Sequence, residues 1–424
     1  MSQRLNLVVT IILYLFLLGV MGGCLDPDHS TQGPAYNHNP NGFLEHNQSS
    51  PLPDEVIDKQ QRESGLEETG EPERSKASFQ QEESHRLRLM VVGDIMMHMP
   101  QIEAGYSKEG YNFFPFFEEV APLFEEADLV MGNLETTLGG PERGYSGYPL
   151  FSAPDELAVA LKQAGFDVIT TANNHSLDSG EKGLLRTIDQ LEQAGLMRTG
   201  TFRSQTERDN ILIITKNNVS LAVLAYTYGT NGIPVPEGKD YLVNLLDEAL
   251  MKRDIMLAKE KADFVSVSIH FGSEYQIYPN EEQKEWVEKL FEWGADLVFG
   301  SHPHVLQPFE LRELTREGKR EEGLVIYSLG NFISNQREIP RDIGGILDVT
   351  LTKTGSERSM ISSVNFIPTY VHRYQQNDRR SYQVIPMERL LELRAYPALN
   401  DEDYQVLGER YQKILEHVVP VMAE

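Results

Sequence analysis

From about residue 86 onward, short runs of apolar residues alternate with longer segments whose apolar residues recur every three or four positions. Short apolar runs are typical of buried strands, and the periodic segments are typical of amphipathic helices. The predicted strands cover residues 87–93, 128–132, 166–172, 263–272 and 296–300. The predicted helices cover residues 113–127, 154–165, 180–195, 247–262 and 280–295. This alternation predicts an α/β domain with a substantial parallel sheet.

Two regions depart from this alternation. Residues 210–227 contain two apolar runs joined by "KNN", which predicts a hairpin, and further strands are expected after residue 323. Residues 387–418 return to a helical pattern. We therefore expect a main domain over residues 86–370 and a helical C-terminal extension over residues 371–424.

The N-terminal residues 1–24 have the order of a secretory signal peptide: one arginine, a long apolar core, and small residues before Cys24. The last four letters, "MGGC", resemble a bacterial lipobox, in which the cysteine is lipidated and becomes the new N-terminus. An uncleaved transmembrane anchor is the alternative, because the apolar stretch is nearly long enough to span a bilayer. Both interpretations place the rest of the chain outside the cytoplasmic membrane, and the first predicts a lipoprotein anchored to that membrane through Cys24.

Residues 25–85 predict a disordered acidic linker. Acidic residues outnumber basic ones there, and apolar residues are sparse and show no period. Such a segment cannot bury enough apolar area to offset the entropy lost on ordering. We expect this linker to hold the main domain away from the membrane.

The charge balance excludes one class of partner. The whole chain has 38 Lys and Arg against 64 Asp and Glu, which gives a formal net charge of −26. A nucleic acid would require a basic face, so we expect no nucleic-acid partner. A phosphorylated small substrate remains compatible with an acidic site, because bound divalent cations can invert the local charge.

Polar side chains of similar chemistry follow the predicted strands that begin at residues 87, 128, 166, 263 and 296. These side chains are Asp94, Asn133, Glu135, Asn173, Asn174, His175, His270, His302 and His304. Taken singly, each is compatible with an ordinary turn residue or a structural histidine. The carboxyl ends of parallel strands share one edge of a sheet, however, and ligand sites lie there. We therefore expect these loops to converge on one crevice.

The donor types in these loops predict a metal site. Carboxylate, amide oxygen and imidazole together suit divalent cations such as Mn²⁺, Zn²⁺ or Fe²⁺. The candidate ligands are Asp94, Glu135, Asn174, His270, His302 and His304. They exceed what one four-coordinate zinc needs. They would suffice for two cations about 3.5–4 Å apart, an arrangement that clamps the oxygens of a phosphoryl displacement. The sequence therefore predicts one or two divalent metal ions of unspecified identity.

Six motifs carry a family resemblance. In order, they read "VGDIMMH", "GNLET", "ANNHSLDSG", "HFGSEY", "GSHPHVLQPFE" and "YSLGNF". They resemble the CapA family of poly-γ-glutamate capsule biosynthesis proteins, which are similar in fold to the calcineurin-like metallophosphoesterases. The resemblance covers roughly residues 87–335. It implies a layered α/β sandwich with mixed sheets and a metal site of phosphoesterase type.

Within this resemblance, Asp94 corresponds to the aspartate that opens the first metallophosphoesterase motif, and His304 would join it on one metal. Glu135 stands where that superfamily has a bridging aspartate. Two features depart from the pattern. Met96 occupies the histidine position of the Asp-x-His motif, and "GNLET" replaces the second motif. These departures predict a weak or empty first metal site and leave hydrolysis an open question, while His98, four residues after Asp94, has no assigned direction.

The resemblance also implies a second metal position. Asn174, His270 and His302 would share it, and His175 would assist the leaving group or stabilise the transition state. Asp178 would orient His175, with a helix cap as the structural alternative.

Three further residues have weaker predicted roles. Asn133 is a supporting or substrate-contacting amide, and Glu274 is a candidate contact for a substrate amine or an acid/base group, with a solvated loop carboxylate as the alternative. Asn331 is a candidate for the floor of the site, although a turn asparagine would explain it equally. The basic residues within 312–323 predict a solvated hairpin, because acidic residues nearly match them.

Two functions follow as hypotheses. The first is a surface-anchored, metal-dependent phosphoesterase-type hydrolase of poly-γ-glutamate synthesis or export. The second is a non-catalytic accessory lipoprotein that binds the membrane subunits of the polyglutamate synthase, or polyglutamate itself.

Overall fold

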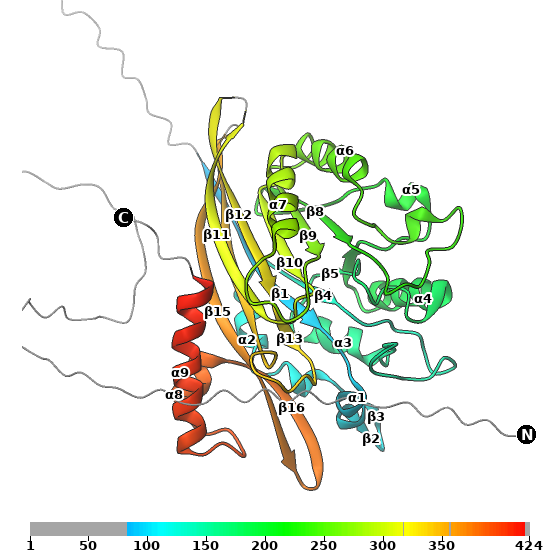
Figure 1. Cartoon of the computed structure of the whole chain (residues 1–424), viewed down its shortest axis with the longest axis vertical. Helices are drawn as coiled ribbons and strands as arrows, with labels where there is room; N and C mark the ends of the chain where they lie inside the picture. The colour runs from blue at the N-terminus through cyan, green and yellow to red at the C-terminus, as the bar shows by residue number, and fades with distance from the viewer. Residues whose placement is uncertain (1–82, 317, 356–357, 420–424) are drawn as a thin grey trace, which may run out of the picture. The chain divides into compact units, whose positions relative to one another are not determined.

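Two mixed β-sheets pack face to face at the centre of the fold (Figure 1). The computed structural model describes residues 83–316, 318–355 and 358–419. The predicted signal peptide, Cys24 and the predicted linker as far as residue 82 lie outside these ranges. The first described strand begins at Ser84, two residues before the predicted start of the main domain.

The first sheet combines a parallel centre with an antiparallel edge. In spatial order its strands are β16 (Arg379–Pro386), β15 (Arg358–Gln376), β14 (Ile343–Thr354), β1 (Ser84–Ile95), β4 (Leu129–Leu134), β5 (Val168–Thr170) and β6 (Met197–Thr199). β13 (Asn331–Ile333) pairs with β1 beside this path. The pairs from β1 to β6 are parallel, whereas β14, β15 and β16 run antiparallel to their neighbours.

The second sheet is also mixed. In spatial order its strands are β11 (Leu306–Arg316), β12 (Lys319–Leu329), β10 (Leu297–Ser301), β9 (Phe264–His270), β8 (Val219–Thr227) and β7 (Leu212–Lys216). The pairs from β12 to β8 are parallel, and the two edge strands are antiparallel. A short separate hairpin joins β2 (Tyr106–Ser107) to β3 (Gly110–Tyr111). The predicted hairpins at 210–227 and 312–323 are both confirmed.

Helices cover the outer faces of the sheets. The described helical segments are α1 (Met99–Gly105), η1 (Phe114–Phe116), α2 (Ala121–Phe124), α3 (Glu156–Gln163), α4 (Gly180–Gln193), α5 (Gln205–Arg208), η2 (Asp240–Leu242), α6 (Glu248–Lys259), α7 (Glu281–Trp293), α8 (Met387–Leu393) and α9 (Asp401–Val418). The helices α1 to α3 pack on the first sheet, and α6 and α7 pack on the second. The predicted layered α/β sandwich with mixed sheets is confirmed.

The central strand β1 shows why the layers form. Leu87, Leu89 and Val91 point into the core between the two sheets, whereas Met90 and Val92 point toward the helices on the outer face. All five are at most 2% exposed. A strand that is buried on both faces reads as a continuous apolar run, because alternate residues serve opposite layers.

The predicted helix at 113–127 is wrong in its extent. The structure has two short segments there, η1 and α2, separated by a turn. Pro115 and Pro122 each lie at the start of one segment. Proline fits the first turn of a helix but lacks the N–H that an interior position needs, so one continuous helix cannot form.

The C-terminal region also differs from its prediction. β15 continues to Gln376, and β16 occupies Arg379–Pro386, so residues 371–386 form mainly a hairpin and helix begins only at Met387. Tyr382 and Val384 alternate into the core of the first sheet, which is the pattern of a strand. α8 and α9 then pack beside β15 and β11 (Figure 1).

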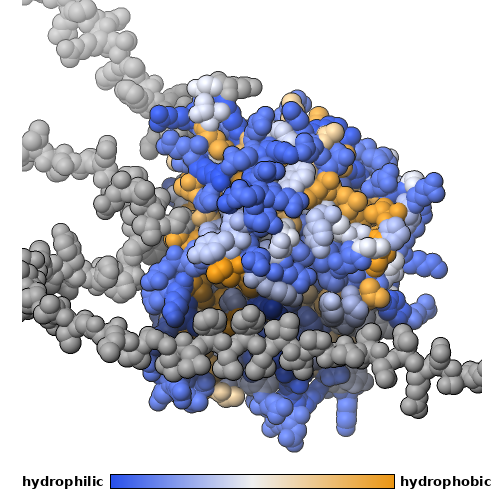
Figure 2. Space-filling view, in the orientation of Figure 1, coloured by the Kyte–Doolittle hydropathy of each residue, from blue (hydrophilic) through white to orange (hydrophobic). Residues whose placement is uncertain are grey.

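The described surface gives no sign of a membrane-spanning segment. Within the described ranges, none of the helices has both the length and the apolar character needed to cross a bilayer. Hydrophilic residues cover most of the face seen in Figure 2, and apolar residues lie there in separate patches.

Candidate metal centre

The carboxyl ends of five strands, drawn from both sheets, meet at one buried cluster. Asp94 lies near the end of β1, and Glu135 directly follows β4. The loop after β5 supplies Asn174 and His175, and β9 ends at His270. The loop after β10 supplies His302 and His304. The structure thus brings together all the predicted ligands, although their predicted roles on a metal stay predictions.

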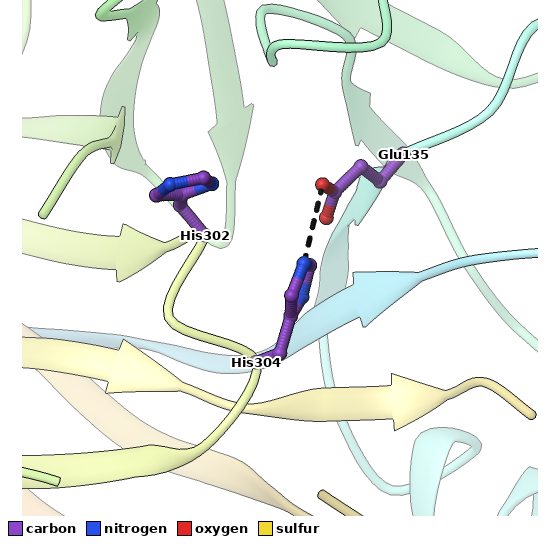
Figure 3. Close-up of side chains that lie close together, drawn as sticks. All are labelled: Glu135, His302 and His304. Atoms are coloured by element: carbon purple, nitrogen blue, oxygen red, sulfur yellow. Dashed lines mark ion pairs between the residues drawn. The ribbon is translucent and has the colours of Figure 1, made fainter. Parts of the chain in front are cut away.

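Glu135 lies at the centre of this cluster. Its Oε1 is 3.5 Å from His270 Nε2 and 3.9 Å from His304 Nε2. Figure 3 shows its carboxylate directed toward His302 and His304. Among the described residues neither carboxylate oxygen has a hydrogen-bond partner, and the residue is 0% exposed. Burial and the nearby charge of Asp94 raise the pKa of Glu135 well above its ordinary value.

Asp94 contacts the cluster from β1. Its Oδ2 lies 3.1 Å from His304 Nδ1, and its Oδ1 accepts a hydrogen bond of 2.9 Å from Asn133 Nδ2. Asn133 in turn accepts one of 3.1 Å from Asn173 Nδ2. Asn133 therefore has a supporting position, in which it fixes one oxygen of Asp94 and leaves the other facing His304.

His270 is held between an amide and a hydroxyl. Its Nε2 lies 2.9 Å from Asn174 Oδ1, and its Nδ1 lies 2.8 Å from Ser301 Oγ. The ring centroid of His302 is 4.9 Å from that of His270. Burial lowers the pKa of both imidazoles, that of His302 to about 4. Asn174, His270 and His302 therefore form the neighbouring set that the family resemblance implied.

The turn that carries His302 and His304 has an unusual backbone. Both residues have positive φ angles, 98° and 60°, which are uncommon for residues with a side chain. The N–H of Tyr275 donates a hydrogen bond of 2.8 Å to the carbonyl of Pro303 at the centre of this turn. Strained backbone of this kind persists where the surrounding structure fixes it, and it is common at functional sites.

The cluster fits a divalent cation. Glu135 and His302 Nδ1 are buried without a hydrogen-bond partner among the described residues, and such groups are costly unless something else satisfies them. The side chains form two sets of possible ligands, and within each set the ligand atoms lie within 4.8 Å of one another. One set consists of Glu135, His302 and His304, and the other of Asp94, Glu135 and His270. Glu135 belongs to both sets, which is the position of a carboxylate that bridges two metal ions.

Distance and protonation give different pictures of the pair Glu135–His270. The separation of 3.5 Å is that of an ion pair. Burial, however, raises the pKa of Glu135 and lowers that of His270, so the isolated chain favours the neutral form of each. Burial dominates because both side chains are completely enclosed. A cation would reverse the preference at Glu135, since it favours an ionised carboxylate and a neutral imidazole alike.

His175 lies at the side of the cluster and is held by Asp178. The His175 Nδ1 is 2.7 Å from Asp178 Oδ2, and the backbone N–H of Phe151 donates to the same oxygen at 2.6 Å. The ring of Phe151 packs edge-on against the imidazole, with centroids 4.7 Å apart. Asn231 Nδ2 lies 3.5 Å from both ring nitrogens. This geometry fits the predicted orienting role of Asp178.

The remaining predicted residues lie at the margin. Glu274 is exposed, although its charge adds to the forces that raise the pKa of Glu135. Asn331 is fully buried and pairs with Asp94 in the β1–β13 register; its Nδ2 donates to the carbonyl of Arg341 at 2.9 Å and so orders the loop before β14, while its predicted place on the floor of the site stays a prediction. Met96 is 2% exposed, and its backbone N–H bonds to Ile333.

The sequence did not identify several residues that contact the cluster. Tyr228 packs against His302 with ring centroids 4.7 Å apart, and Tyr275 lies 6.1 Å from His304 by the same measure. His98 packs against Phe151. Burial lowers the pKa of His98 to about 4, and the nearby imidazoles of His304 and His175 contribute to this lowering. Tyr275 and His98 both lie in quoted motifs, "HFGSEY" and "VGDIMMH", although neither received a predicted contact with the cluster; Tyr228 gave no signal.

The fold and the cluster define a mixed α/β sandwich protein with a buried carboxylate–imidazole site suited to a divalent cation. Residues 88–336 match the family model described as "Bacterial capsule synthesis protein PGA_cap". The chain therefore belongs to this family, and the predicted relation to CapA is confirmed.

Two named relatives agree with this assignment. The chain is 32% identical over 272 residues to "Capsule biosynthesis protein CapA" of Bacillus anthracis, a match that covers 61% of this chain and 62% of that protein. It is 28% identical over 288 residues to "PGA biosynthesis protein CapA" of Bacillus subtilis, covering 65% and 70%. The match thus spans less than two thirds of the Bacillus anthracis protein. The NAD nucleotidase of Haemophilus influenzae aligns over 78% of this chain and 60% of its own, with 12% identity and a TM-score of 0.42, which is too low to support an argument.

Proposed function

We propose that this chain is a surface-anchored CapA-like protein of poly-γ-glutamate capsule synthesis or export, and that its buried cluster is a metal-dependent phosphoesterase site. The observation that supports this proposal is Glu135, whose two oxygens have no hydrogen-bond partner in the part of the chain that the structure describes and are enclosed with His270, His302 and His304. A buried carboxylate without a partner destabilises the fold, whereas a bound cation would compensate its charge.

The residues that would hold the metal fall into two neighbouring sets. By the family resemblance, Asp94 and His304 would form one, and Asn174, His270 and His302 the other, with Glu135 between them. The atoms that lie within 4.8 Å of one another group differently, as Asp94, Glu135 and His270 and as Glu135, His302 and His304, so the assignment of His270 and His302 to one ion rests on the resemblance. One or two ions such as Mn²⁺, Zn²⁺ or Fe²⁺ would supply Lewis acidity that polarises a phosphoryl oxygen and lowers the pKa of water.

His175 would supply the proton for the leaving group. Asp178 accepts a hydrogen bond from Nδ1–H in this role, so Nε2 is the nitrogen that faces the substrate. The ring of Phe151 keeps the imidazole upright by edge-on packing. Such a histidine acts on the substrate without being a metal ligand.

The proposal includes an extracytoplasmic location. A lipid on Cys24 would anchor the chain to the cytoplasmic membrane, and the supporting feature is the apolar N-terminal stretch that ends in "MGGC". Membrane subunits of a polyglutamate synthase would then be within reach as partners. Incorporation of a radiolabelled fatty acid during growth, compared between wild type and Cys24→Ala, measures this anchoring, and retention of label by the variant would contradict it.

A second function is favoured by the Met96 departure. A buried methionine stands where the metallophosphoesterase pattern has a metal-binding histidine. A centre with fewer ligands could bind a cation without hydrolysing a phosphoester, which would leave an accessory lipoprotein that binds the polymer-synthesis machinery or polyglutamate. Names of the two Bacillus relatives refer to biosynthesis and not to hydrolysis.

Metal analysis of the purified chain, by plasma mass spectrometry, tests the proposal. We expect one or two divalent ions per chain, lost in His302→Ala and retained in His175→Ala and in His85→Ala, a control at the opposite end of β1. The same proteins are then assayed with phosphodiesters and phosphomonoesters. Hydrolysis should be lost in both cluster variants, and full capsule output from a His175→Ala/His302→Ala strain would rule out the enzyme as the biological role.

A further inference from the structure

A row of arginines leads away from the metal centre on a chain that is otherwise strongly acidic. The row consists of Arg341, Arg337, Arg373 and Arg380, which we call the basic strip. We propose that the basic strip binds a polyanionic chain whose repeated oxyanion groups are carboxylates, and that it guides this chain to the mouth of the metal centre. The choice of carboxylate rests on the proposed role in polyglutamate synthesis, whereas the strip itself rests on the contacts below.

Arg341 marks the end of the strip nearest the cluster. Its guanidinium carbon lies 3.4 Å from the ring centroid of Tyr275, whose own ring lies 6.1 Å from that of His304. Its side chain is 24% exposed, and its Nη1 donates to Glu338 Oε2 at 3.1 Å. Within the described part of the chain Nε and Nη2 have no acceptor, so two donors of a planar fork remain for an oxyanion.

The loop before β14 connects Arg341 to the rest of the strip. Arg373 Nη1 donates to the carbonyls of Asn335 and Gln336 at 3.5 and 3.3 Å, and the Tyr382 hydroxyl donates to Asn335 Oδ1 at 2.6 Å. Arg373 and Tyr382 are direct partners in the β15–β16 register. These contacts fix the loop, and with it Arg341, against the end of the first sheet.

Two titratable groups report how close the arginines lie. Backbone hydrogen bonds and the charges of Arg341 and Arg373 lower the pKa of Glu338. Burial raises the pKa of Tyr382, and the charges of Arg380, Arg373 and Arg337 oppose that rise. The charge of Arg373 acts on both groups, in agreement with its hydrogen bonds to the loop and its register with Tyr382.

Among the described residues, the arginines of the strip form one ion pair, that of Arg341 with Glu338, although Glu103 and Asp378 lie near its far end. Glu338 is 69% exposed and pairs with Arg341 only. The next acid along the chain, Asp342, is paired with Arg410 of α9 at 3.1 Å between Nη1 and Oδ2. Arg337 is exposed, and among the described residues its side chain has no hydrogen-bond or ion-pair partner. The chain has a net charge of −26, so most of its surface repels an anion. A local excess of arginine attracts an anion to this one region.

The far end of the strip opens into a cavity. Arg379 and Arg380 line a space of about 240 Å³ together with Gln375 and with Pro100 and Ala104 of α1, and two carboxylates, Glu103 and Asp378, line it as well. α1 directly follows the loop of Asp94, so the cavity and the metal centre lie at opposite ends of one short segment. A chain bound along the strip would thus have one end at the cavity and the other at Tyr275.

The test is a binding measurement on the purified full chain, with EDTA present, by fluorescence anisotropy of a short fluorescein-labelled γ-linked glutamate oligomer. We expect Arg337→Glu/Arg380→Glu to weaken binding by about tenfold or more, because two attractive contacts become repulsive. The matched control is Lys319→Glu/Arg320→Glu at the exposed β11–β12 turn, which changes the net charge equally and should alter binding less than about twofold. Circular dichroism confirms folding, and Arg337→Gln/Arg380→Gln replaces the reversal if it does not fold.

Each outcome decides between the proposals. Unchanged binding by the folded strip variant, or an equal loss in the control, would overturn the basic strip. Tighter binding of a polyphosphate of matched charge than of the glutamate oligomer would overturn the carboxylate assignment. Oligomer binding by a chain that proves metal-free when it is purified without EDTA would support the strip while contradicting the phosphoesterase site, and hydrolysis without oligomer binding would do the reverse.

Discussion

His175 Nδ1 lies 2.7 Å from Asp178 Oδ2, and both side chains are buried at the edge of the metal centre. The same carboxylate oxygen also accepts the backbone N–H of Phe151, so the loop, the carboxylate and the imidazole form one rigid unit. This unit determines which nitrogen of His175 faces outward, and it makes Asp178 a positioning residue.

Asp178→Asn should therefore lower turnover without removing metal. Asparagine can keep the bond from Phe151, but it no longer fixes the tautomer of His175. We expect hydrolysis of bis-p-nitrophenyl phosphate to fall by about 10- to 100-fold with unchanged metal content. A fall in metal content parallel to the fall in rate would show that Asp178 supports the ligands and not His175.

Glu135→Gln should have opposite effects on stability with and without metal. Glutamine keeps the shape of the side chain but removes a buried carboxylate that has no partner among the described residues. In EDTA we expect the variant to be at least as stable as wild type. With Mn²⁺ at about 100 times its Kd, wild type should gain about 2.7 kcal/mol and the variant much less. Urea unfolding in both buffers measures this, and equal gains would place the metal elsewhere.

Gly93→Ala should destabilise the fold beneath the site. A Cβ at residue 93 would lie 2.0 Å from the carbonyl oxygen of Gly330, which also accepts the N–H of Asp94 at 2.9 Å. Relief requires β1 and β13 to separate, and we expect a loss of about 3 kcal/mol in the free energy of unfolding. Gly229→Ala is the control, because a Cβ there meets nothing within 4 Å, and its change should stay within about 0.5 kcal/mol. Comparable losses in both variants would contradict the clash.

His98 should make stability depend on pH. Burial lowers its pKa from 6.5 to about 4 in the folded chain, so between those values the unfolded chain binds a proton that the folded chain does not. Stability is therefore present above pH 6.5 and falls as the pH drops toward 4. Between pH 7 and 5, wild type should lose about 2 kcal/mol more than His98→Asn in urea unfolding. Parallel losses would show that His98 stays solvated.

The sequence predicted the centre of the site better than its surroundings. Asp94, Glu135, His270, His302 and His304 follow apolar runs, and the shared edge of parallel strands is a general property of such sheets. The positive φ angles of His302 and His304 were not predictable, because tertiary contacts such as that of Tyr275 with Pro303 impose them. Tyr228 was not predictable either, since an isolated tyrosine in a loop carries no period.

The C-terminal strands show a similar limit. Residues 379–386 alternate between polar and apolar side chains, but the run is short, and helices follow it. Only pairing with β15 decides its structure. The basic strip depends on this same hairpin, because Arg373 and Arg380 come together through strand register and not through proximity in the chain.

The placement of the ligands on two sheets has a mechanical consequence. Asp94 lies in β1 and Glu135 directly follows β4 in the first sheet, whereas His270 ends β9 and His302 directly follows β10 in the second. A cation held by all of them would cross-link the two sheets at one edge of the sandwich. Metal supply would then set the stiffness of that edge, and protease resistance of the domain would rise and fall with it.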